Sequence, residues 1–298
     1  MIIITGQTAT GKTKLALKLA KKHNGELINF DSRQVYKHLD IITGKDKDLI
    51  TMKQWNNITI WMYDAVMPDQ YFSSFDFVKL ATLIIKDVED RNKTPILVGG
   101  TYLYLKHFLY GSDYKVPPNF KLREKLNNKS VDYLQKSLIS LNPQVFKRLN
   151  HSDQLNPRRL IRRIEIVTFH KKVKTPVFEQ SPGAPLSGVR RRKNTVSSFK
   201  IIGLRYKDKS KLRLAIEKRV GERLKNGAID EVKKLLKMGY TENDPGLKTI
   251  GYQQIIKFLN KKITEKQAVE DWINKEVQYA KRQLTFMKKD KNIEWKKI

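Results

Sequence analysis

Short apolar blocks and helically spaced segments alternate along the first third of the chain. The blocks are rich in Ile, Leu and Val and are bounded by glycine, proline or aspartate, a pattern typical of strands buried on both faces. We expect these strands at residues 1–4, 26–30, 58–62 and 95–98. Apolar residues that recur every three or four positions predict helices at 14–22, 75–90 and 102–109, the second capped by Ser74. Alternating strands and helices predict a parallel, doubly wound α/β sheet.

The pattern changes at Pro117-Pro118. From residue 120 to about 174 it is wholly helical, and residues 182–192 are rich in glycine, proline and serine, which indicates a loop. We then expect a strand at 198–204 and helices at 211–225, 228–238, 249–260 and 264–286. The prediction is therefore a core interrupted by an insertion: the first part of the α/β core (1–116), an all-helical insertion (117–196), and the second part of the core with C-terminal helices (197–298).

The first strand leads directly into the sequence GQTATGKT, which fits the P-loop pattern G-x-x-x-x-G-K-[ST]. The glycines let backbone N–H groups converge on phosphate oxygens, and the start of the following helix adds its positive end. Lys12 supplies a mobile positive charge, and the Thr13 hydroxyl can bind Mg²⁺. The sequence thus predicts a P-loop-type core whose phosphate site is formed by Gly6, Thr8, Ala9, Thr10, Gly11, Lys12 and Thr13.

The sequence does not decide which phosphate compound this loop binds. P-loop NTPases usually have a further strand that ends in a carboxylate for magnesium or water, but the strand at 95–98 runs into Gly99-Gly100-Thr101. Asp31, after the strand at 26–30, either binds the metal or acts as a base beside the phosphates; the plain alternative is a helix cap or a turn residue. Thr101 either faces the same phosphate site at the strand ends or merely caps the next helix.

Composition narrows the class of protein. The chain has 298 residues with 60 Lys and Arg against 30 Asp and Glu, a net charge of +30, and no cysteine, which excludes disulfide scaffolds and cysteine metal sites. The net charge is +4 over residues 1–111, +14 over 112–200 and +12 over 201–298. This excess favours a polyanionic partner, although an AT-rich genome also enriches lysine. The chain has neither a membrane-spanning apolar stretch nor a signal peptide, and we expect a cytoplasmic protein.

Three clusters together resemble the tRNA dimethylallyltransferases, also called tRNA isopentenyltransferases: GQTATGKT, then DSRQVY at 31–36, then VGGTYLY at 98–104. Residues 156–165 and 278–286 also resemble segments of that family, and the resemblance covers nearly the whole chain. The chain departs from the family pattern at Arg163, Gln253 and Phe286. It ends at Ile298, before the zinc finger found in eukaryotic relatives, so we expect a bacterial-type enzyme.

The resemblance implies a reaction and a set of roles. The dimethylallyl group of dimethylallyl diphosphate passes to the N6 amine of the adenosine immediately 3′ of the anticodon, in tRNAs that read codons beginning with U. Asp31 would accept the amine proton, Thr101 would bridge the nucleophile and the leaving oxygen, and Arg219 would join the P-loop on the diphosphate. The tRNA contacts implied are Ser32, Gln34, Tyr36, Arg158, Arg159, Arg282 and Gln283.

The basic run Arg190-Arg191-Arg192-Lys193 is a candidate contact to the tRNA backbone, since Lys and Arg on phosphates give affinity without sequence choice. Its plain alternative is a solvated run of charges. We expect a monomer that needs Mg²⁺ and binds the anticodon stem-loop. Two other functions remain open at this stage: an ATP-dependent small-molecule or nucleoside kinase, and a non-catalytic RNA-binding protein.

Overall fold

A computed structural model describes residues 1–45, 58–111, 116–173 and 199–298. The chain divides into two compact units, one formed by Met1–Leu109 and Val189–Ile298 and the other by Tyr110–Gly188. We call them the sheet unit and the helical unit. The described strands are β1 (Ile2–Gly6), β2 (Gly25–Asn29), β3 (Ile60–Trp61), β4 (Thr94–Val98), β5 (Lys200–Arg205) and β6 (Ile293–Lys297).

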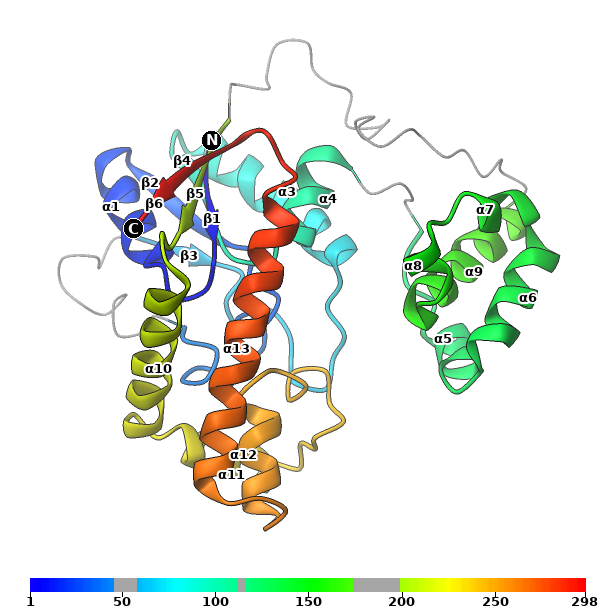
Figure 1. Cartoon of the computed structure of the whole chain (residues 1–298). Coiled ribbons are helices and arrows are strands. Elements are labelled where there is room, and N and C mark those ends of the chain that lie inside the picture. Colours follow the sequence, from blue (N-terminus) through cyan, green and yellow to red (C-terminus); the bar gives the residue numbers. More distant parts are fainter. Residues whose placement is uncertain (46–57, 112–115, 174–198) are drawn as a thin grey trace. The chain divides into compact units, whose positions relative to one another are not determined.

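The helices of the sheet unit are α1 (Lys12–Lys22), α3 (Ser74–Asp90), α4 (Tyr102–Tyr110), α10 (Lys209–Lys225), α11 (Ala228–Lys237), α12 (Tyr252–Leu259) and α13 (Glu265–Met287) (Figure 1). The helices of the helical unit are α5 (Phe120–Asn127), α6 (Val131–Leu141), α7 (Pro143–Lys147), α8 (His151–Gln154) and α9 (Pro157–Lys172). None of the helices in the described part of the chain is long and apolar enough to cross a membrane.

The sheet is parallel throughout, with strand order β3-β2-β4-β1-β5-β6. Different helices cover its two faces. Successive side chains of a strand point to opposite faces, so neighbouring residues of β1 enter different cores. Ile4 packs in a core with α1, whereas Ile3 packs in a core with α3 and α4. The predicted doubly wound α/β fold is therefore confirmed, and it brings the carboxyl ends of β1, β2 and β4 to one edge of the sheet.

A third core lies beyond the carboxyl ends of these strands. Segment 31–45, which follows β2, packs its apolar residues against α10, α11, α12 and α13; Leu39, Ile42 and Trp272 in this core are at most 1% exposed. This core places the polar side chains of α10 and α13 opposite the P-loop. The helical C-terminal region thus forms one wall of the site.

Three local differences between the prediction and the structure have clear physical reasons. The cap of α3 is Ser73 rather than Ser74: the Ser73 hydroxyl accepts the Asp76 N–H, and the Asp76 carboxylate accepts the Ser73 N–H. Helix α12 begins at Tyr252, because Gly251 before it has φ 98°. Strand β6 was not predicted, since only its first residue, Ile293, is buried and the strand lies at the sheet edge, where lysines are common.

The helical unit has a core of its own, formed by leucine, isoleucine and valine side chains from α5, α6, α7 and α9. Its buried carboxylate, Glu165, is bound by the guanidinium groups of Arg123 and Arg162 and by the Asn119 backbone N–H. Burial alone would raise the Glu165 pKa, but these hydrogen bonds outweigh it and hold the pKa below its ordinary value. Glu165 therefore fastens the start of α5 to α9.

Candidate active site

The P-loop has the backbone that its sequence predicts. Gly6 ends β1 with φ 136°, and a Cβ atom there would lie 2.1 Å from the Leu204 carbonyl oxygen on β5. Gly11, with φ 74°, is the N-cap of α1. Glycine is therefore required at Gly6 for close strand packing and at Gly11 for the left-handed turn into the helix.

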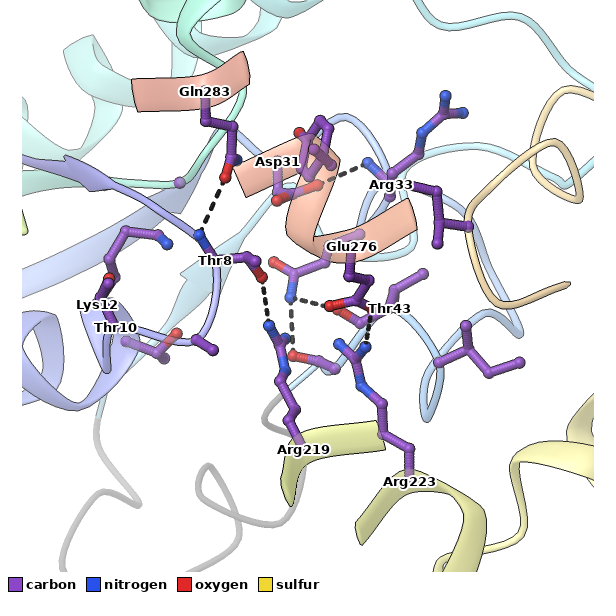
Figure 2. Close-up of a pocket in the computed structure, with 18 of the residues that line it drawn as sticks. Thr8, Thr10, Lys12, Asp31, Arg33, Thr43, Arg219, Arg223, Glu276 and Gln283 are labelled. Carbon is purple, nitrogen blue, oxygen red and sulfur yellow. Dashed lines mark hydrogen bonds and ion pairs between the residues drawn. The ribbon is translucent and has the colours of Figure 1, made fainter. Parts of the chain in front are cut away.

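Side chains around the loop converge on its polar atoms. The Lys12 Nζ donates to the Gln7 carbonyl over 2.6 Å, and the Thr10 hydroxyl donates to the same oxygen over 2.8 Å. From α10, the Arg219 Nη1 donates to the Thr8 Oγ1 over 2.6 Å, a contact drawn in Figure 2. The predicted phosphate-binding cation Arg219 thus contacts the loop that contains Lys12, although the two residues lie far apart in the sequence.

Asp31 and Thr101 follow the neighbouring strands β2 and β4. The Asp31 Oδ1 accepts the Arg33 N–H over 2.9 Å, so one carboxylate oxygen shapes the turn. The Thr101 Oγ1 accepts the Ser32 N–H over 2.9 Å and donates to the Ser32 Oγ over 3.1 Å. The structure therefore brings the two predicted catalytic residues together through Ser32, which was predicted to contact tRNA.

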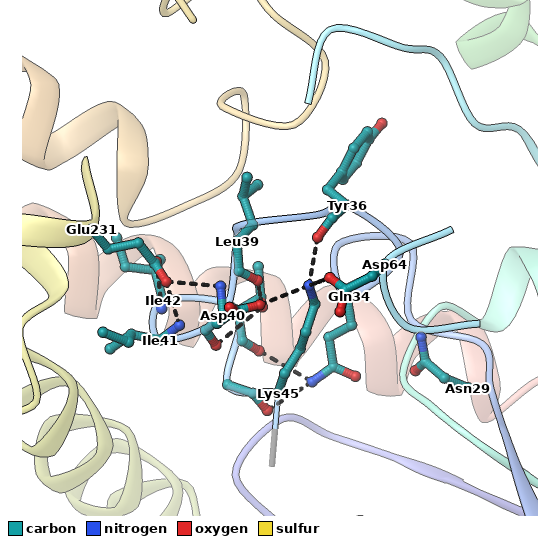
Figure 3. Close-up of polar contacts among 12 residues, drawn as sticks. Asn29, Gln34, Tyr36, Leu39, Asp40, Ile41, Ile42, Lys45, Asp64 and Glu231 are labelled. Atoms are coloured by element: carbon teal, nitrogen blue, oxygen red, sulfur yellow. Dashed lines mark hydrogen bonds and ion pairs between the residues drawn. The ribbon is translucent and has the colours of Figure 1, made fainter. Parts of the chain in front are cut away.

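The segment after Asp31 is held by internal contacts (Figure 3). The Gln34 Nε2 donates to the carbonyls of Thr43 and Gly44, over 3.2 Å and 2.8 Å. Tyr36 is 3% exposed and packs in the third core, where burial raises the pKa of its hydroxyl. In this conformation both side chains shape the loop, and the Tyr36 ring offers no open face for stacking. Their tRNA contacts stay a prediction.

Two further charged groups fix the same segment (Figure 3). The buried Lys45 ammonium pairs with Asp40 over 2.9 Å and with Asp64, and it donates to the Tyr36 carbonyl. The Glu231 carboxylate on α11 accepts the backbone N–H groups of residues 40, 41 and 42. One wall of the site is thereby tied to α11, a part of the sequence that motif analysis did not connect with it.

A cavity of about 910 Å³ opens between the P-loop, Asp31 and helices α10 and α13 (Figure 2). Its volume lies in the range of small-molecule sites. Predicted residues that line it are Thr8, Ala9, Thr10, Gly11, Lys12, Thr13, Asp31, Gln34, Arg219, Arg282 and Gln283. The charged or aromatic lining residues that the prediction did not include are Lys14, Arg33, Tyr63, Lys218, Glu222, Arg223, Lys248, Glu276 and Tyr279. The cavity is therefore more cationic than the motifs alone indicated.

Arg223 and Glu276 form a buried pair behind Arg219. The Arg223 Nη1 lies 2.6 Å from the Glu276 Oε1, which also accepts the Trp272 Nε1–H over 3.0 Å. Burial, helped by the positive charge of Arg219, lowers the Arg223 pKa, which at about 10 still leaves it charged at neutral pH. Burial opposes ionisation of Glu276 as well, but the charges of Arg223 and Arg219 outweigh it and lower its pKa. A carboxylate thus holds two guanidinium groups close together.

Gly44 explains how these guanidinium groups reach the cavity. A Cβ atom at Gly44 would lie 2.5 Å from the Arg219 Nη2 and 2.8 Å from the Arg223 Nη2. A side chain at position 44 would therefore have to displace these two guanidinium groups. The sequence signal was the glycine in the run Ile42-Thr43-Gly44, but nothing in the sequence identified its partner.

Tyr279 on α13 lines the cavity near Asp31. Burial, together with the charge of Asp31, raises the Tyr279 pKa to about 12, so the phenol keeps its proton and can donate a hydrogen bond. The sequence signal is its place in the segment QYAKRQ, for which the prediction named Arg282 and Gln283 but not Tyr279.

The remaining predicted tRNA contacts lie in different surroundings. Arg282 is exposed beside the cavity, while Gln283 is buried. Arg158 and Arg159 are exposed in the first turn of α9, in the helical unit, and Arg159 pairs with Asp153. The basic run 190–193 lies outside the described residues.

Comparisons with known proteins found related sequences and structures. The family model described as IPP transferase matches residues 34–290. A tRNA dimethylallyltransferase from Thermoanaerobacter sp. (strain X514) is 37% identical over 99% of this chain and 90% of its own length. A tRNA isopentenylpyrophosphate transferase structure from Staphylococcus epidermidis is 32% identical, with a TM-score of 0.66 over 99% of this chain and 92% of that one.

A eukaryotic dimethylallyltransferase that acts on tRNA shares the fold. Its TM-score is 0.75 at 24% identity, and the match covers 96% of this chain and 69% of that one.

Proposed function

The chain belongs to the IPP transferase family, and from this membership we propose how its cavity prenylates tRNA. The enzyme is a transferase that moves a prenyl group onto tRNA. In our proposal the donor is dimethylallyl diphosphate, and the acceptor is the N6 amine of the adenosine immediately 3′ of the anticodon, in tRNAs that read codons beginning with U. The observation that supports the proposal is that P-loop residues and Asp31 line one cavity, while Thr101 follows the strand β4, which lies between β1 and β2.

The diphosphate is the leaving group. The allylic C1–O bond breaks and its electron pair departs with the diphosphate, whose growing negative charge is stabilised by Lys12, Arg219 and the P-loop N–H groups. Positive charge that develops on the allylic carbon is delocalised within the prenyl group. This chemistry needs no activated water, which fits a β4 strand that runs into Gly99 and Gly100 rather than a carboxylate.

The acceptor amine is a weak nucleophile. As the N6–C1 bond forms, the amine must lose a proton, and we assign its acceptance to Asp31. In our proposal Thr101, whose hydroxyl is hydrogen-bonded to Ser32, bridges the amine and the leaving oxygen. The adenine must leave the stacked anticodon loop to reach an enclosed cavity.

Mg²⁺ fits this site as an ion carried with the diphosphate. The described residues hold no group of three or more His, Cys, Asp or Glu side chains that would form a protein cage. Thr13 is among the P-loop residues that line the cavity, and Mg²⁺ commonly binds through one or two protein oxygens, substrate phosphates and water. Thr13 would hold the ion, and the ion would neutralise diphosphate charge.

The test is nucleoside mass spectrometry of unmodified tRNA incubated with the protein, Mg²⁺ and dimethylallyl diphosphate. We expect isopentenyladenosine at the position 3′ of the anticodon and release of diphosphate without ATP. Transfer that requires ATP, or phosphorylation in place of prenylation, would favour the kinase alternative. Prenylation elsewhere in the tRNA would overturn the proposed acceptor.

A further inference from the structure

Gln283 joins two loops of the site through one side chain. Its Oε1 accepts the Thr8 backbone N–H over 3.0 Å, and its Nε2 donates to the Gly100 carbonyl over 2.9 Å. The side chain lies in the last turns of α13 and is 7% exposed; Figure 2 shows it pointing at Thr8. One amide therefore connects the P-loop to the loop that carries Thr101.

The packing around this amide leaves little freedom. A Cβ atom at Gly100 would lie 2.5 Å from the Gln283 Nε2 and 3.7 Å from the Asp31 Oδ2. The amide thus occupies the space that a side chain at position 100 would need. Gly100 permits three groups, the amide, the Thr101 loop and the Asp31 carboxylate, to approach one another.

A second glutamine ties the P-loop to the same helix. The Gln7 Nε2 donates to the Ala280 carbonyl of α13 over 3.4 Å, and its Oε1 accepts the Tyr206 N–H over 3.2 Å. The P-loop is therefore attached to α13 at both Gln7 and Thr8. The Gln283 contact belongs to this attachment and does not depend on a bound ligand.

The neighbouring Arg282 has the opposite character. It is exposed and lines the cavity, where a tRNA phosphate can approach it, whereas Gln283 is buried with its carbonyl and amide groups already in hydrogen bonds to the protein. The two residues were predicted together as tRNA contacts. Because one is exposed and the other is buried, we expect them to have different roles.

We propose that Gln283 is a positioning residue that sets the spacing between the diphosphate-binding loop and the Thr101 loop. The inference rests on the proposed function, because that spacing aligns the leaving oxygen with Thr101 and the amine. Glutamine suits the role since it carries a donor and an acceptor in one planar group. Misplacing reacting groups by about 1 Å can cost on the order of 100-fold in rate.

The test compares Gln283→Met with Arg282→Ala in steady-state prenyl transfer to tRNA. Methionine keeps the unbranched shape but neither satisfies the Thr8 N–H nor donates to the Gly100 carbonyl. For Gln283→Met we expect kcat to fall on the order of 100-fold with the KM for tRNA unchanged. For Arg282→Ala we expect the reverse: a raised KM for tRNA with kcat nearly unchanged.

Gly100→Ala reaches the same contact from the other side, since its new methyl group displaces the Gln283 amide. If the contact carries the effect, the double variant Gly100→Ala/Gln283→Met loses little more rate than either single variant. Equal, independent losses that multiply in the double variant would contradict the proposal. So would a Gln283→Met enzyme with normal kcat and a raised KM for tRNA, which would make Gln283 a tRNA contact.

Two controls keep the failures apart. Transfer by the unchanged enzyme is measured first, and its absence would overturn the proposed function rather than the role of Gln283. Circular dichroism and thermal unfolding of each variant show whether it folds. If Gln283→Met does not fold, the kinetics of Gly100→Ala decide: normal kcat in a folded Gly100→Ala enzyme would overturn the inference.

Discussion

The sheet unit and the helical unit each bury a carboxylate between arginines, but the two carboxylates have different consequences. In the sheet unit, Glu276 holds Arg223 behind Arg219, whose guanidinium contacts the P-loop. In the helical unit, Glu165 holds Arg123 and Arg162 and so fastens α5 to α9. The same kind of interaction fixes a guanidinium group beside Arg219 in one unit and packs two helices against each other in the other. We therefore expect prenyl transfer to be sensitive to the positions of side chains in the sheet unit. In the helical unit, we expect exposed positive charges, rather than the buried Glu165, to affect function.

The largest effect should follow removal of the proposed proton acceptor. Asp31→Asn keeps the side-chain shape and the oxygen that accepts the Arg33 N–H, but it removes the base. General-base catalysis contributes about 10²- to 10⁴-fold, so we expect kcat to fall by that order while tRNA binding persists. Single-turnover transfer and a filter-binding assay measure the two quantities.

Glu222→Gln is the matched control, because Glu222 is another carboxylate that lines the cavity, on α10. It should leave kcat within a few-fold of the original. Loss of tRNA binding along with transfer in Asp31→Asn would show that Asp31 shapes the loop, as the turn-residue alternative holds.

The second prediction compares the loss of stability and the change of KM when each buried carboxylate is replaced by glutamine. Glu276→Gln leaves the buried Arg223 without its counter-charge, which typically costs about 3–5 kcal/mol. Glu165→Gln should cost less, because its partners Arg123 and Arg162 are 33% and 32% exposed. Urea unfolding measures both losses. Glu276→Gln should also raise the KM for dimethylallyl diphosphate, because Arg219 lies beside Arg223. An equal rise in Glu165→Gln would break the distinction between the units.

The same pair predicts an acid dependence. Both carboxyl groups have a lowered pKa in the folded protein, so each stabilises the fold fully above the pKa of the unfolded chain, near 4.3. That stabilisation is lost as pH falls through the lowered folded-state pKa. Each glutamine variant should therefore show a smaller loss of stability between neutral and acid pH than the unchanged protein.

The parts of the site that lie directly after a predicted strand could be predicted from the sequence. The P-loop glycines, Asp31 and Thr101 follow strands that hydrophobic patterning identifies, and parallel pairing brings strand ends together. Contacts between distant segments were not predictable in this way. Nothing in the local pattern pairs Gly44 with Arg219, or Gln283 with Gly100, because these approaches depend on how α10 and α13 pack. Strand β6 was missed for a similar reason: Gly203 on β5 makes room for Ile293 and Trp295, which only the folded sheet brings there.

A smaller effect should come from the outer side of the P-loop. The Tyr206 hydroxyl, after β5, donates to the Ala9 carbonyl over 2.5 Å, and Ala9 has φ 61°. By holding that carbonyl, Tyr206 keeps the following Thr10 N–H pointing in the opposite direction, because the two groups are antiparallel in a planar trans peptide. Tyr206→Phe removes one hydrogen bond worth about 1 kcal/mol, so we expect the KM for dimethylallyl diphosphate to rise by about 5-fold.

Inhibition by inorganic diphosphate should weaken by the same factor in Tyr206→Phe, and the KM for tRNA should not change. A change in the KM for tRNA alone would place Tyr206 on the RNA-binding side of the site. Burial raises the Tyr206 pKa, so the hydroxyl stays protonated and no change of this contact is expected near neutral pH.

The smallest effect concerns exposed charge in the helical unit. Arg158 lies in the first turn of α9, where the helix dipole disfavours a cation, so its charge does not serve the stability of that helix. Arg158→Ala should leave thermal stability unchanged or slightly higher. If Arg158 contacts an RNA phosphate, tRNA binding should weaken by a few-fold and the slope of log K against log salt should fall by about 1, with kcat unchanged. Arg159→Ala is the neighbouring comparison, since Arg159 already pairs with Asp153 and should affect the salt slope less. An unchanged slope in Arg158→Ala would remove this turn of α9 from the RNA-binding surface and leave the excess charge of the helical unit to other residues.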